Sequence, residues 1–408
     1  MIGHQTKGRS VSSTTRFIAV AFALVVAAGV SSAASCSSTP QESTSPSPQA
    51  STSAATDLVI ACATGPKSAT LSLVSMTGEK TDLVTSDGAE IDEIAVSPSG
   101  AYIAYNERFR DMNADWDYGS RLMIYNVASG KTAAYFTSPF MSQVPEGNIM
   151  AWAVGDRAWV SDSEMIVVAY TYRPLDPFSN GDLVLCNVDT DKCEPLSGSS
   201  GDLTGTAPSV SADGSRLAFV TYGPAGSEEV DDTLNLYDFK DKSIRTVAAK
   251  RRGTPEAYEQ FANPLLSPDG TMIFTEQTGS DVGFQITVYN VDGTKRFSSD
   301  TLLAANDAAW GPSGSGLIAF TGSADVDTPK SGIQFYDAKA NHIEDPTWTL
   351  GHANALAWSP DGKWLAYTEP GGNNDLGDDL HLVNADRTSD TVLLTGASSP
   401  SFGVITAQ

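Results

Sequence analysis

The stretch Ala357-Trp358-Ser359-Pro360-Asp361-Gly362-Lys363-Trp364-Leu365-Ala366-Tyr367 holds two short apolar runs separated by a turn. Proline fixes φ and glycine accepts a positive φ, so Ser-Pro-Asp-Gly favours a tight reversal of the chain. Apolar runs of this length on either side of turn residues are typical of buried β-strands. The stretch therefore predicts a β-hairpin.

The same pattern occurs earlier in the chain, at intervals of about 50 residues, which is a spacing found in β-propellers. The copies lie at 94–105, 159–170 (a worn copy), 208–219, 265–274 and 309–320. A second predicted hairpin follows each copy, and one more precedes the first copy. The first strands of these second hairpins are Leu71–Val74, Leu122–Tyr125, Leu183–Cys186, Leu234–Tyr237, Ile286–Tyr289, Ile333–Tyr336 and Leu382–Val383.

The two ends of the repeat region hold the missing strands. The pattern predicts that Leu58–Ala61 is the second strand of a repeat that lacks its first strand. It predicts that Ser401–Ile405 is the first strand of a repeat that lacks its second strand. We therefore predict an all-β fold, a seven-bladed β-propeller of four-stranded antiparallel blades closed by pairing of the N- and C-terminal strands. Two stacked sandwiches, or a six-bladed ring with decorations, are the alternatives.

The Ser-Pro-Asp-Gly turn followed by a Leu/Ile-Ala-Phe/Tyr strand, as in 359–367, resembles the TolB-like propeller repeat. That repeat is also found in the propeller domains of prolyl oligopeptidases. The resemblance covers 57–408 and implies a propeller. It implies no single activity, because the repeat occurs both in binding scaffolds and in the gating domains of peptidases.

The composition excludes several classes of protein. The 408 residues include 49 acidic and 25 basic side chains, a net charge of −24, whereas nucleic-acid binding needs a basic surface. Aromatic residues at 9% argue against a disordered chain, and 4 cysteines are too few for a disulfide scaffold.

Residues 1–35 have the pattern of a signal peptide, with three basic residues ahead of the apolar run Phe17–Val30. The run is short for a membrane span, which takes about 20 residues. The sequence Ala33-Ala34-Ser35-Cys36 resembles the lipobox of bacterial lipoproteins, although Ala33 stands where an aliphatic residue such as Leu is usual. It predicts a lipid on Cys36; ordinary cleavage with Cys36 incidental is the alternative.

Residues 36–56 are rich in Ser, Thr and Pro and have few large apolar side chains, so they predict a disordered tether. We expect an exported protein on the outer face of the cell membrane, attached through the lipid anchor alone, with the propeller in 57–408. A monomer is expected.

The residues do not favour catalysis. There is no Gly-x-Ser-x-Gly nucleophile motif and no clustered Cys/His set for zinc, and the three histidines of the repeat region are predicted in loops or at the surface. These are His342, His352 and His381. We expect a non-enzymatic binding module for an envelope protein, peptide or glycan. The alternative is a lyase or glycan hydrolase with paired carboxylates at the central channel.

The predicted connections between second and third strands are long and acidic, which places a negative loop face on the propeller. One of them, 111–117, has oxygen side chains at alternate positions: Asp111, Asn113, Asp115 and Asp117. That spacing resembles a calcium loop, but Trp116 replaces the glycine of the sharp turn and Leu122 replaces the bidentate glutamate. A solvated acidic loop and a Ca²⁺ site are both open, and no other cofactor is expected.

Two further features are predicted. Cys186 and Cys193 lie in one hairpin, symmetric about 189–190, which favours a cross-strand disulfide in an exported protein and leaves Cys62 unpaired. A reduced pair is the alternative. The basic run Lys250-Arg251-Arg252 is either a contact for an anionic partner or a solvated segment.

Overall fold

The structure is a computed structural model that describes residues 56–65, 68–87, 89–110, 117–135, 153–170, 180–198, 201–223, 231–251, 259–279, 283–299, 307–322, 332–344, 353–370 and 378–406. Within these ranges the chain forms antiparallel β-strands and no α-helix, so the predicted all-β class is confirmed. No helix in the described part is long and apolar enough to cross a membrane.

The first and last strands of the described chain lie in one four-stranded sheet, in the order β3-β2-β1-β30. Its strands are β1 (Thr56–Thr64), β2 (Thr70–Ser75), β3 (Lys80–Thr85) and β30 (Ala397–Thr406). The C-terminal strand runs antiparallel to the N-terminal one, with Leu58 opposite Val404 and Ile60 opposite Phe402. The sequence predicted this pairing of the two incomplete ends.

Four other sheets each contain four consecutive strands. They are β4 (Ala89–Val96), β5 (Tyr102–Arg110), β6 (Asp117–Asn126) and β7 (Lys131–Tyr135); β18 (Glu259–Leu266), β19 (Met272–Gly279), β20 (Gly283–Asn290) and β21 (Lys295–Ser298); β22 (Ala308–Trp310), β23 (Leu317–Gly322), β24 (Gly332–Asp337) and β25 (His342–Glu344); and β26 (Asn354–Trp358), β27 (Trp364–Pro370), β28 (Asp378–Asn384) and β29 (Asp390–Thr395).

An eight-stranded sheet combines two more groups of four, because β10 also pairs with β14 at Gly181–Gly205 and Asp182–Thr204. The groups are β8 (Ala153–Trp159), β9 (Glu164–Tyr170), β10 (Gly181–Asn187) and β11 (Lys192–Pro195), and β14 (Thr204–Val210), β15 (Arg216–Thr221), β16 (Asp231–Asp238) and β17 (Ser243–Arg251). A small hairpin between them, β12 (Ser197–Gly198) with β13 (Gly201–Asp202), was not predicted.

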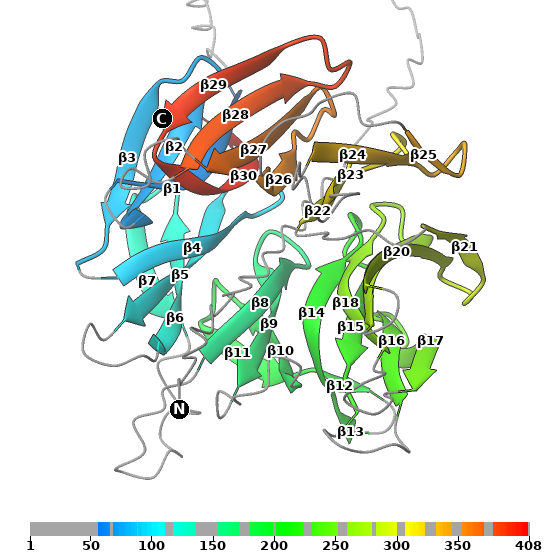
Figure 1. Ribbon diagram of the computed structural model, residues 1–408. Coiled ribbons are helices and arrows are strands. Elements are labelled where there is room, and N and C mark those ends of the chain that lie inside the picture. The colour runs from blue at the N-terminus through cyan, green and yellow to red at the C-terminus, as the bar shows by residue number, and fades with distance from the viewer. Residues whose placement is uncertain are drawn as a thin grey trace, which may run out of the picture.

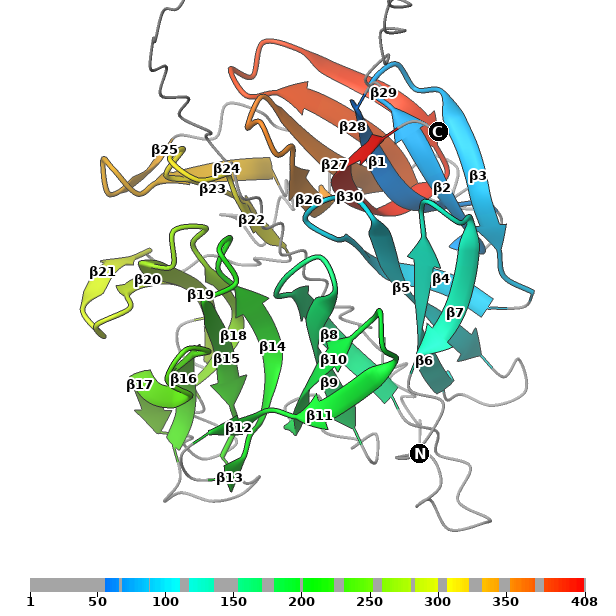
Figure 2. The same cartoon turned by 180° about the vertical axis from the view of Figure 1, so that it is seen from behind.

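Figures 1 and 2 show these groups following one another in chain order around a common centre, a propeller-like arrangement. We call the strand of each group that lies nearest the centre its inner strand: β4, β8, β14, β18, β22, β26 and β30. Clusters of apolar side chains fill the spaces between neighbouring groups. In one of them Ala309 of β22 and Phe335 of β24 pack with Trp358 of β26 and Tyr367 of β27.

The Ser-x-Asp-Gly turns have one common hydrogen-bonding pattern. In the turn after β18, Ser267 Oγ donates to Asp269 Oδ1 (2.6 Å) and accepts from the backbone N–H of Met272 (2.9 Å). Gly270 has a φ of +67°, which is why glycine is required at that position. We call the side of the molecule that carries these turns the turn face. The opposite side, where second and third strands connect, is the loop face.

Inner strands of neighbouring groups are tied together by tryptophans. Each Trp Nε1 donates to a backbone carbonyl of the preceding inner strand: Trp159 to Ala95 (3.2 Å), Trp310 to Leu265 (2.8 Å) and Trp358 to Ala309 (3.2 Å). The Ala-Trp pair of the repeat therefore supplies both the buried side chain and the link to the next group.

Candidate functional site

The inner strands carry a repeated bulge. In five of them the pairing register shifts, and within the shift one residue that is not glycine has a positive φ between 49° and 57°. Such residues are strained, and bulges of this kind re-aim side chains near functional sites. The residues are Glu93, Ala207, Asn263, Ala355 and Ser399.

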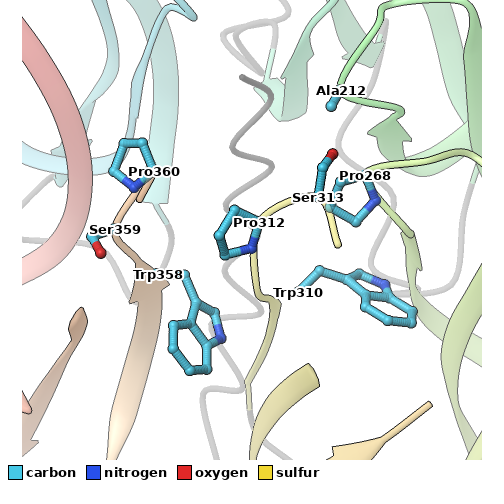
Figure 3. Close-up of a pocket in the computed structure, with 8 residues that line it drawn as sticks. All are labelled: Ala212, Pro268, Trp310, Pro312, Ser313, Trp358, Ser359 and Pro360. Atoms are coloured by element: carbon cyan, nitrogen blue, oxygen red, sulfur yellow. The ribbon is translucent and has the colours of Figure 1, made fainter. Parts of the chain in front are cut away.

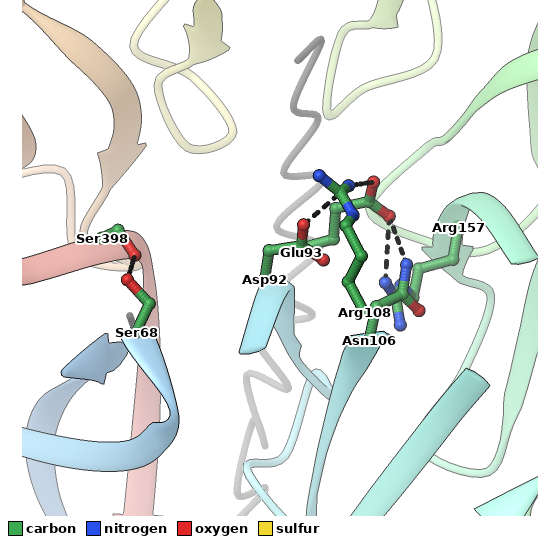
Figure 4. A network of polar contacts seen from close by, with 7 residues as sticks. All are labelled: Ser68, Asp92, Glu93, Asn106, Arg108, Arg157 and Ser398. Carbon is green, nitrogen blue, oxygen red and sulfur yellow. Dashed lines mark hydrogen bonds and ion pairs between the residues drawn. The ribbon is translucent and has the colours of Figure 1, made fainter. Parts of the chain in front are cut away.

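The bulge at Glu93 holds a polar network, drawn in Figure 4. Glu93 Oε2 lies 3.1 Å from Arg157 Nη2 of β8 and accepts a hydrogen bond from Asn106 Nδ2 of β5 at 2.9 Å. Arg108 Nη2 lies 2.7 Å from Asp92 Oδ2 and 3.9 Å from Glu93 Oε1. We call Asp92, Glu93, Asn106, Arg108 and Arg157 the β4–β8 network. The Ser68–Ser398 hydrogen bond (3.0 Å) lies apart from it.

The network lies toward the loop face. β4 begins at Ala89 and reaches its turn only after Val96, whereas β5 continues past Arg108 toward the connection 111–116. On the opposite face of the same sheet, Arg121 Nε donates to Glu107 Oε2 at 2.6 Å, and the Arg121 side chain is 49% exposed. Charged groups of both signs therefore lie on both faces of this sheet toward the loop face.

Arg157 is not fully satisfied by the described residues. Its side chain is 2% exposed, and its Nε and Nη1 atoms have no hydrogen-bond partner among them. A buried guanidinium with unmet donors carries a desolvation cost. The adjacent Asp156 carboxylate accepts from the backbone N–H of Ala207 at 3.1 Å. Burial and the nearby Glu93 carboxylate raise the pKa of Asp156 to about 7, although Ala207 and Arg157 oppose the shift.

A second carboxyl group with a shifted pKa lies in the group that begins with β18. Glu276 is 2% exposed, and its Oε2 accepts from Asn263 Nδ2 at 3.0 Å. Burial and the neighbouring Asp307 raise the pKa of Glu276 well above its ordinary value. A protonated carboxyl beside a second carboxyl is an arrangement that general acid–base catalysis uses.

The position of His381 differs from the one predicted from the sequence. The prediction of a surface or loop position is wrong, because His381 lies in β28, is 9% exposed and stacks on Tyr367 at 4.7 Å between ring centroids. The ring packs there because its Nδ1 lies 3.1 Å from Asp390 Oδ1 and its Nε2 lies 3.6 Å from Glu369 Oε2. His342 is exposed in β25, and His352 lies outside the described residues.

The turn face carries a small pocket with a cavity volume of about 20 Å³, shown in Figure 3. Its walls come from the ends of four consecutive inner strands, β14, β18, β22 and β26, and the turns that follow them. The lining includes Pro268, Trp310, Pro312, Ser313, Trp358 and Pro360.

The structure joins Cys186 and Cys193 by a disulfide, opposite each other in β10 and β11, and Cys62 is a buried free thiol. Lys250 Nζ lies 5.9 Å from the centre of the Phe261 ring. Arg251 is described only as part of β17, and Arg252 lies outside the described residues.

The proposed lipid site and most of the proposed calcium loop lie outside the described residues: Cys36, Asp111, Asn113 and Asp115. Of Asp117 only the backbone, at the start of β6, is described. In the part of the chain that the structure describes, no three His, Cys, Asp or Glu side chains are grouped as a metal site would need.

Sequence reasoning missed the β4–β8 network, although a signal was present. Asp92 and Glu93 precede the first repeat copy, and Asn106 to Arg108 follow it directly, so ionic side chains extend strands predicted to be buried. Buried charges are usually paired, and that rule would have predicted contacts between these two segments.

No family model and no curated protein sequence matches this chain. A puromycin-hydrolyzing peptidase of Mycobacterium tuberculosis matches with a TM-score of 0.54 and 14% identity, over 83% of this chain and 52% of the peptidase. An oligogalacturonate lyase in complex with manganese matches with a TM-score of 0.52 and 17% identity, over 77% of this chain and 82% of the lyase.

TolB of Acinetobacter baumannii matches with a TM-score of 0.44 and 14% identity, over 85% of this chain and 66% of TolB. The chain thus spans about half the length of the peptidase and less than two thirds of TolB. The similarities to the peptidase and the lyase support a β-propeller fold. At such low identity they carry no information on activity.

Proposed function

We propose that the protein is a seven-bladed, closed β-propeller that acts as a non-enzymatic binding module. Five four-stranded sheets and the two halves of the eight-stranded sheet provide the seven blades. The β1–β30 pairing supports the closure, since it completes the blade that contains both chain ends.

The proposed location is the outer face of the cell membrane, with a lipid on Cys36 and a tether over 36–56. The strand register supports an orientation for this proposed anchor. β1 starts opposite the end of β30, with Asp57 opposite Ile405, and a Cβ on Gly100 of the turn after β4 would lie 3.5 Å from Ile405 Cγ1. This supports a tether that joins the propeller at the turn face, with the loop face directed away from the membrane.

The β4–β8 network is the single observation that carries the binding proposal. It places two guanidinium groups and two carboxylates on β4, β5 and β8 under the loop face, with Glu93 held at a strained bulge. Arg108, which at 19% is the most exposed charged group of the network, is the group that a polar partner would reach, and such charge complementarity gives specificity more than bulk affinity. The expected partner is an envelope protein, peptide or glycan.

The second candidate function is a lyase or glycan hydrolase. It is favoured by the raised pKa of Glu276 beside Asp307. Burial weakens this candidate, because a side chain that is 2% exposed is not open to a substrate. Turnover of envelope glycans or acidic oligosaccharides that Glu276→Gln abolishes would favour the enzyme.

The binding proposal is tested by crosslinking intact cells and purifying the lipidated protein from their membranes. Specific envelope partners are expected with the wild-type chain. Recovery of nothing above an untagged background would contradict the proposal.

A further inference from the structure

Two side chains of the β4–β8 network, Glu93 and Arg108, face each other across a short gap. Glu93 Oε1 lies 3.9 Å from Arg108 Nη2, which is too long for a direct hydrogen bond. Two hydrogen bonds of about 2.8 Å that meet at one oxygen at roughly a right angle span about 4 Å. The separation is therefore the one that a single bridging oxygen atom fills. We call it the Glu93–Arg108 gap.

Both sides of the gap are held in place by neighbouring groups. The other oxygen of Glu93, Oε2, lies 3.1 Å from Arg157 Nη2 and accepts from Asn106 Nδ2 at 2.9 Å. Arg108 Nη2 lies 2.7 Å from Asp92 Oδ2, and Figure 4 shows its guanidinium between the two carboxylates. A ligand group that enters the gap therefore meets a preorganised acceptor and donor, and its binding orders little of the protein.

The other repeats show that the fold itself does not need these charges. Arg157 lies two residues before the tryptophan of β8, and the same position in β22 and β26 holds the buried residues Ala308 and Leu356. At the bulge, Ala355 has a positive φ close to that of Glu93. Well-packed apolar residues often serve a fold as well as a buried ion pair does, and departures from a structural pattern are expected at functional sites. We therefore regard Arg157 as a positioning residue that holds Glu93 from the next inner strand.

The gap selects an uncharged hydroxyl group. A hydroxyl oxygen accepts from the Arg108 guanidinium while its hydrogen is donated to Glu93 Oε1, so one atom satisfies both sides. A carboxylate has no hydrogen to donate and is repelled by Glu93, and an ammonium group cannot accept from Arg108. The net charge of −24 further disfavours anions.

We propose that the Glu93–Arg108 gap binds a hydroxyl group of a neutral glycan. This inference rests on the proposed binding function and names the class of its partner. Glu93 and Arg108 are 13% and 19% exposed, so the gap is open to solvent but recessed. A sugar ring carries hydroxyls along its edge and reaches a recessed pair more readily than the surface of a folded protein does. The ligand hydroxyl takes the place of a water molecule that makes the same two hydrogen bonds.

The test measures the affinity of the mature chain for hexasaccharides that differ in charge. Galactose and mannose hexamers are paired with galacturonate and mannuronate hexamers, which carry carboxylates. A glucose hexamer is paired with a glucosamine hexamer, which carries ammonium groups. At least one neutral hexamer should bind about tenfold or more tightly than its charged counterpart, because the gap rejects both kinds of charge.

The double variant Glu93→Ala/Arg157→Leu replaces the pair with the residues of β26, Ala355 and Leu356. Its thermal stability should stay close to that of the wild type, since apolar side chains replace an ion pair. Its affinity for the neutral hexamer should fall about tenfold or more, because the acceptor of the gap is lost.

A second variant and a control complete the set. Arg108→Lys keeps a positive charge beside Asp92 but removes the planar guanidinium, so the affinity should fall about fivefold or more. Ser399→Ala changes the bulge residue of β30 and should bind the neutral hexamer as the wild type does. Thermal unfolding is measured for every variant.

Stronger binding of the charged hexamers, no binding of any neutral hexamer, or neutral binding that both variants retain would overturn the proposal. A double variant that is unfolded would also overturn it, by assigning Arg157 to the stability of the fold. None of these results alone removes the proposed binding function. Capture of the same envelope proteins from membranes by the wild type and Arg108→Lys would retain a binding module and overturn only its glycan class.

Discussion

The Asp156 carboxylate of β8 accepts a hydrogen bond from the backbone N–H of Ala207 in β14, 51 residues further along the chain, at 3.1 Å. Ala207 has a φ of 51°, so the bond holds a strained bulge residue in the next inner strand. Asp307 makes the same kind of link, accepting from the N–H of Leu356, beside the bulge residue Ala355, at 3.1 Å. A carboxylate in or next to one inner strand thus fixes the bulge of the next.

Replacing Asp156 with Asn should stabilise the protein at pH 8 relative to the wild type. The Asn oxygen can still accept from Ala207, while the cost of ionising a buried carboxyl is removed. A carboxyl whose folded pKa is raised to about 7 stabilises the fold fully below its unfolded pKa near 4, and this stability is lost as the pH rises through 7. In urea unfolding, the free energy of unfolding of Asp156→Asn minus that of the wild type should increase by roughly 1–4 kcal/mol when the pH is raised from 5 to 8.

Thr206→Val, which removes a hydroxyl at 3.4 Å from the same carboxylate, is the control for general disturbance of the bulge. A difference between Asp156→Asn and wild type that stays constant from pH 5 to pH 8 would show that Asp156 has an ordinary pKa.

Deleting residues 400–408 should cost far more stability than deleting residues 407–408 alone. The deletion removes Phe402, which is 1% exposed, and most of the strand that pairs with β1. Loss of a buried Phe alone costs about 3–5 kcal/mol, and β1 would lose its backbone partners as well. Thermal unfolding of this variant should be compared with deletion of 407–408 alone. Equal melting temperatures would refute closure by the terminal strands.

His381→Gln should destabilise the protein more at pH 6 than at pH 9. Burial alone would lower the pKa of His381, but Asp390 and Glu369 together raise it above its ordinary value. The resulting stability is fully present below the unfolded pKa and is lost as the pH rises through the folded pKa. A charge-assisted hydrogen bond contributes about 1.5–3 kcal/mol, and denaturant midpoints at the two pH values measure it. His342→Gln, at an exposed histidine of β25, is the control, and equal losses for His381→Gln at both pH values would show that its charge does not matter.

Reduction of the Cys186–Cys193 disulfide should lower stability only modestly. The bond closes a loop with a sequence separation of 7, for which loop entropy gives about 2 kcal/mol. Unfolding of the wild type with and without dithiothreitol, beside a Cys186→Ala/Cys193→Ala double variant, measures the difference. A double variant that still responds to dithiothreitol would point to a different disulfide pairing.

The repeat was predictable because its chemistry is local. The Ser and Asp side chains of each turn form hydrogen bonds within six residues, so the hairpins can be predicted from the local sequence. The tryptophans mark the ends of inner strands. The incomplete ends at Leu58 and Ser401 predicted the β1–β30 pairing because a missing strand must find a partner.

The β4–β8 network was not predictable in the same way. Glu93 and Arg157 are 64 residues apart and meet only because neighbouring blades set their inner strands side by side. The prediction for His381 was wrong for a related reason, since its partners Glu369 and Asp390 lie on the two strands that flank β28. A histidine in a strand is read as exposed until those neighbours are known.

The binding claim is tested most directly by capturing partners on a defined variant pair. The wild-type chain, Arg121→Ala in the loop-face half of β6 and Lys363→Ala on the turn face are expressed in the native cell, crosslinked and purified from membranes. Arg121 and Lys363 are 49% and 74% exposed. Because Arg121 also pairs with the buried Glu107, thermal unfolding of Arg121→Ala is measured to establish that the variant is folded. We predict that one set of envelope partners is recovered with wild type and Lys363→Ala and is reduced about tenfold or more with Arg121→Ala, in line with loss of a charged interface contact. Equal recovery with all three chains would contradict a binding site at the loop face.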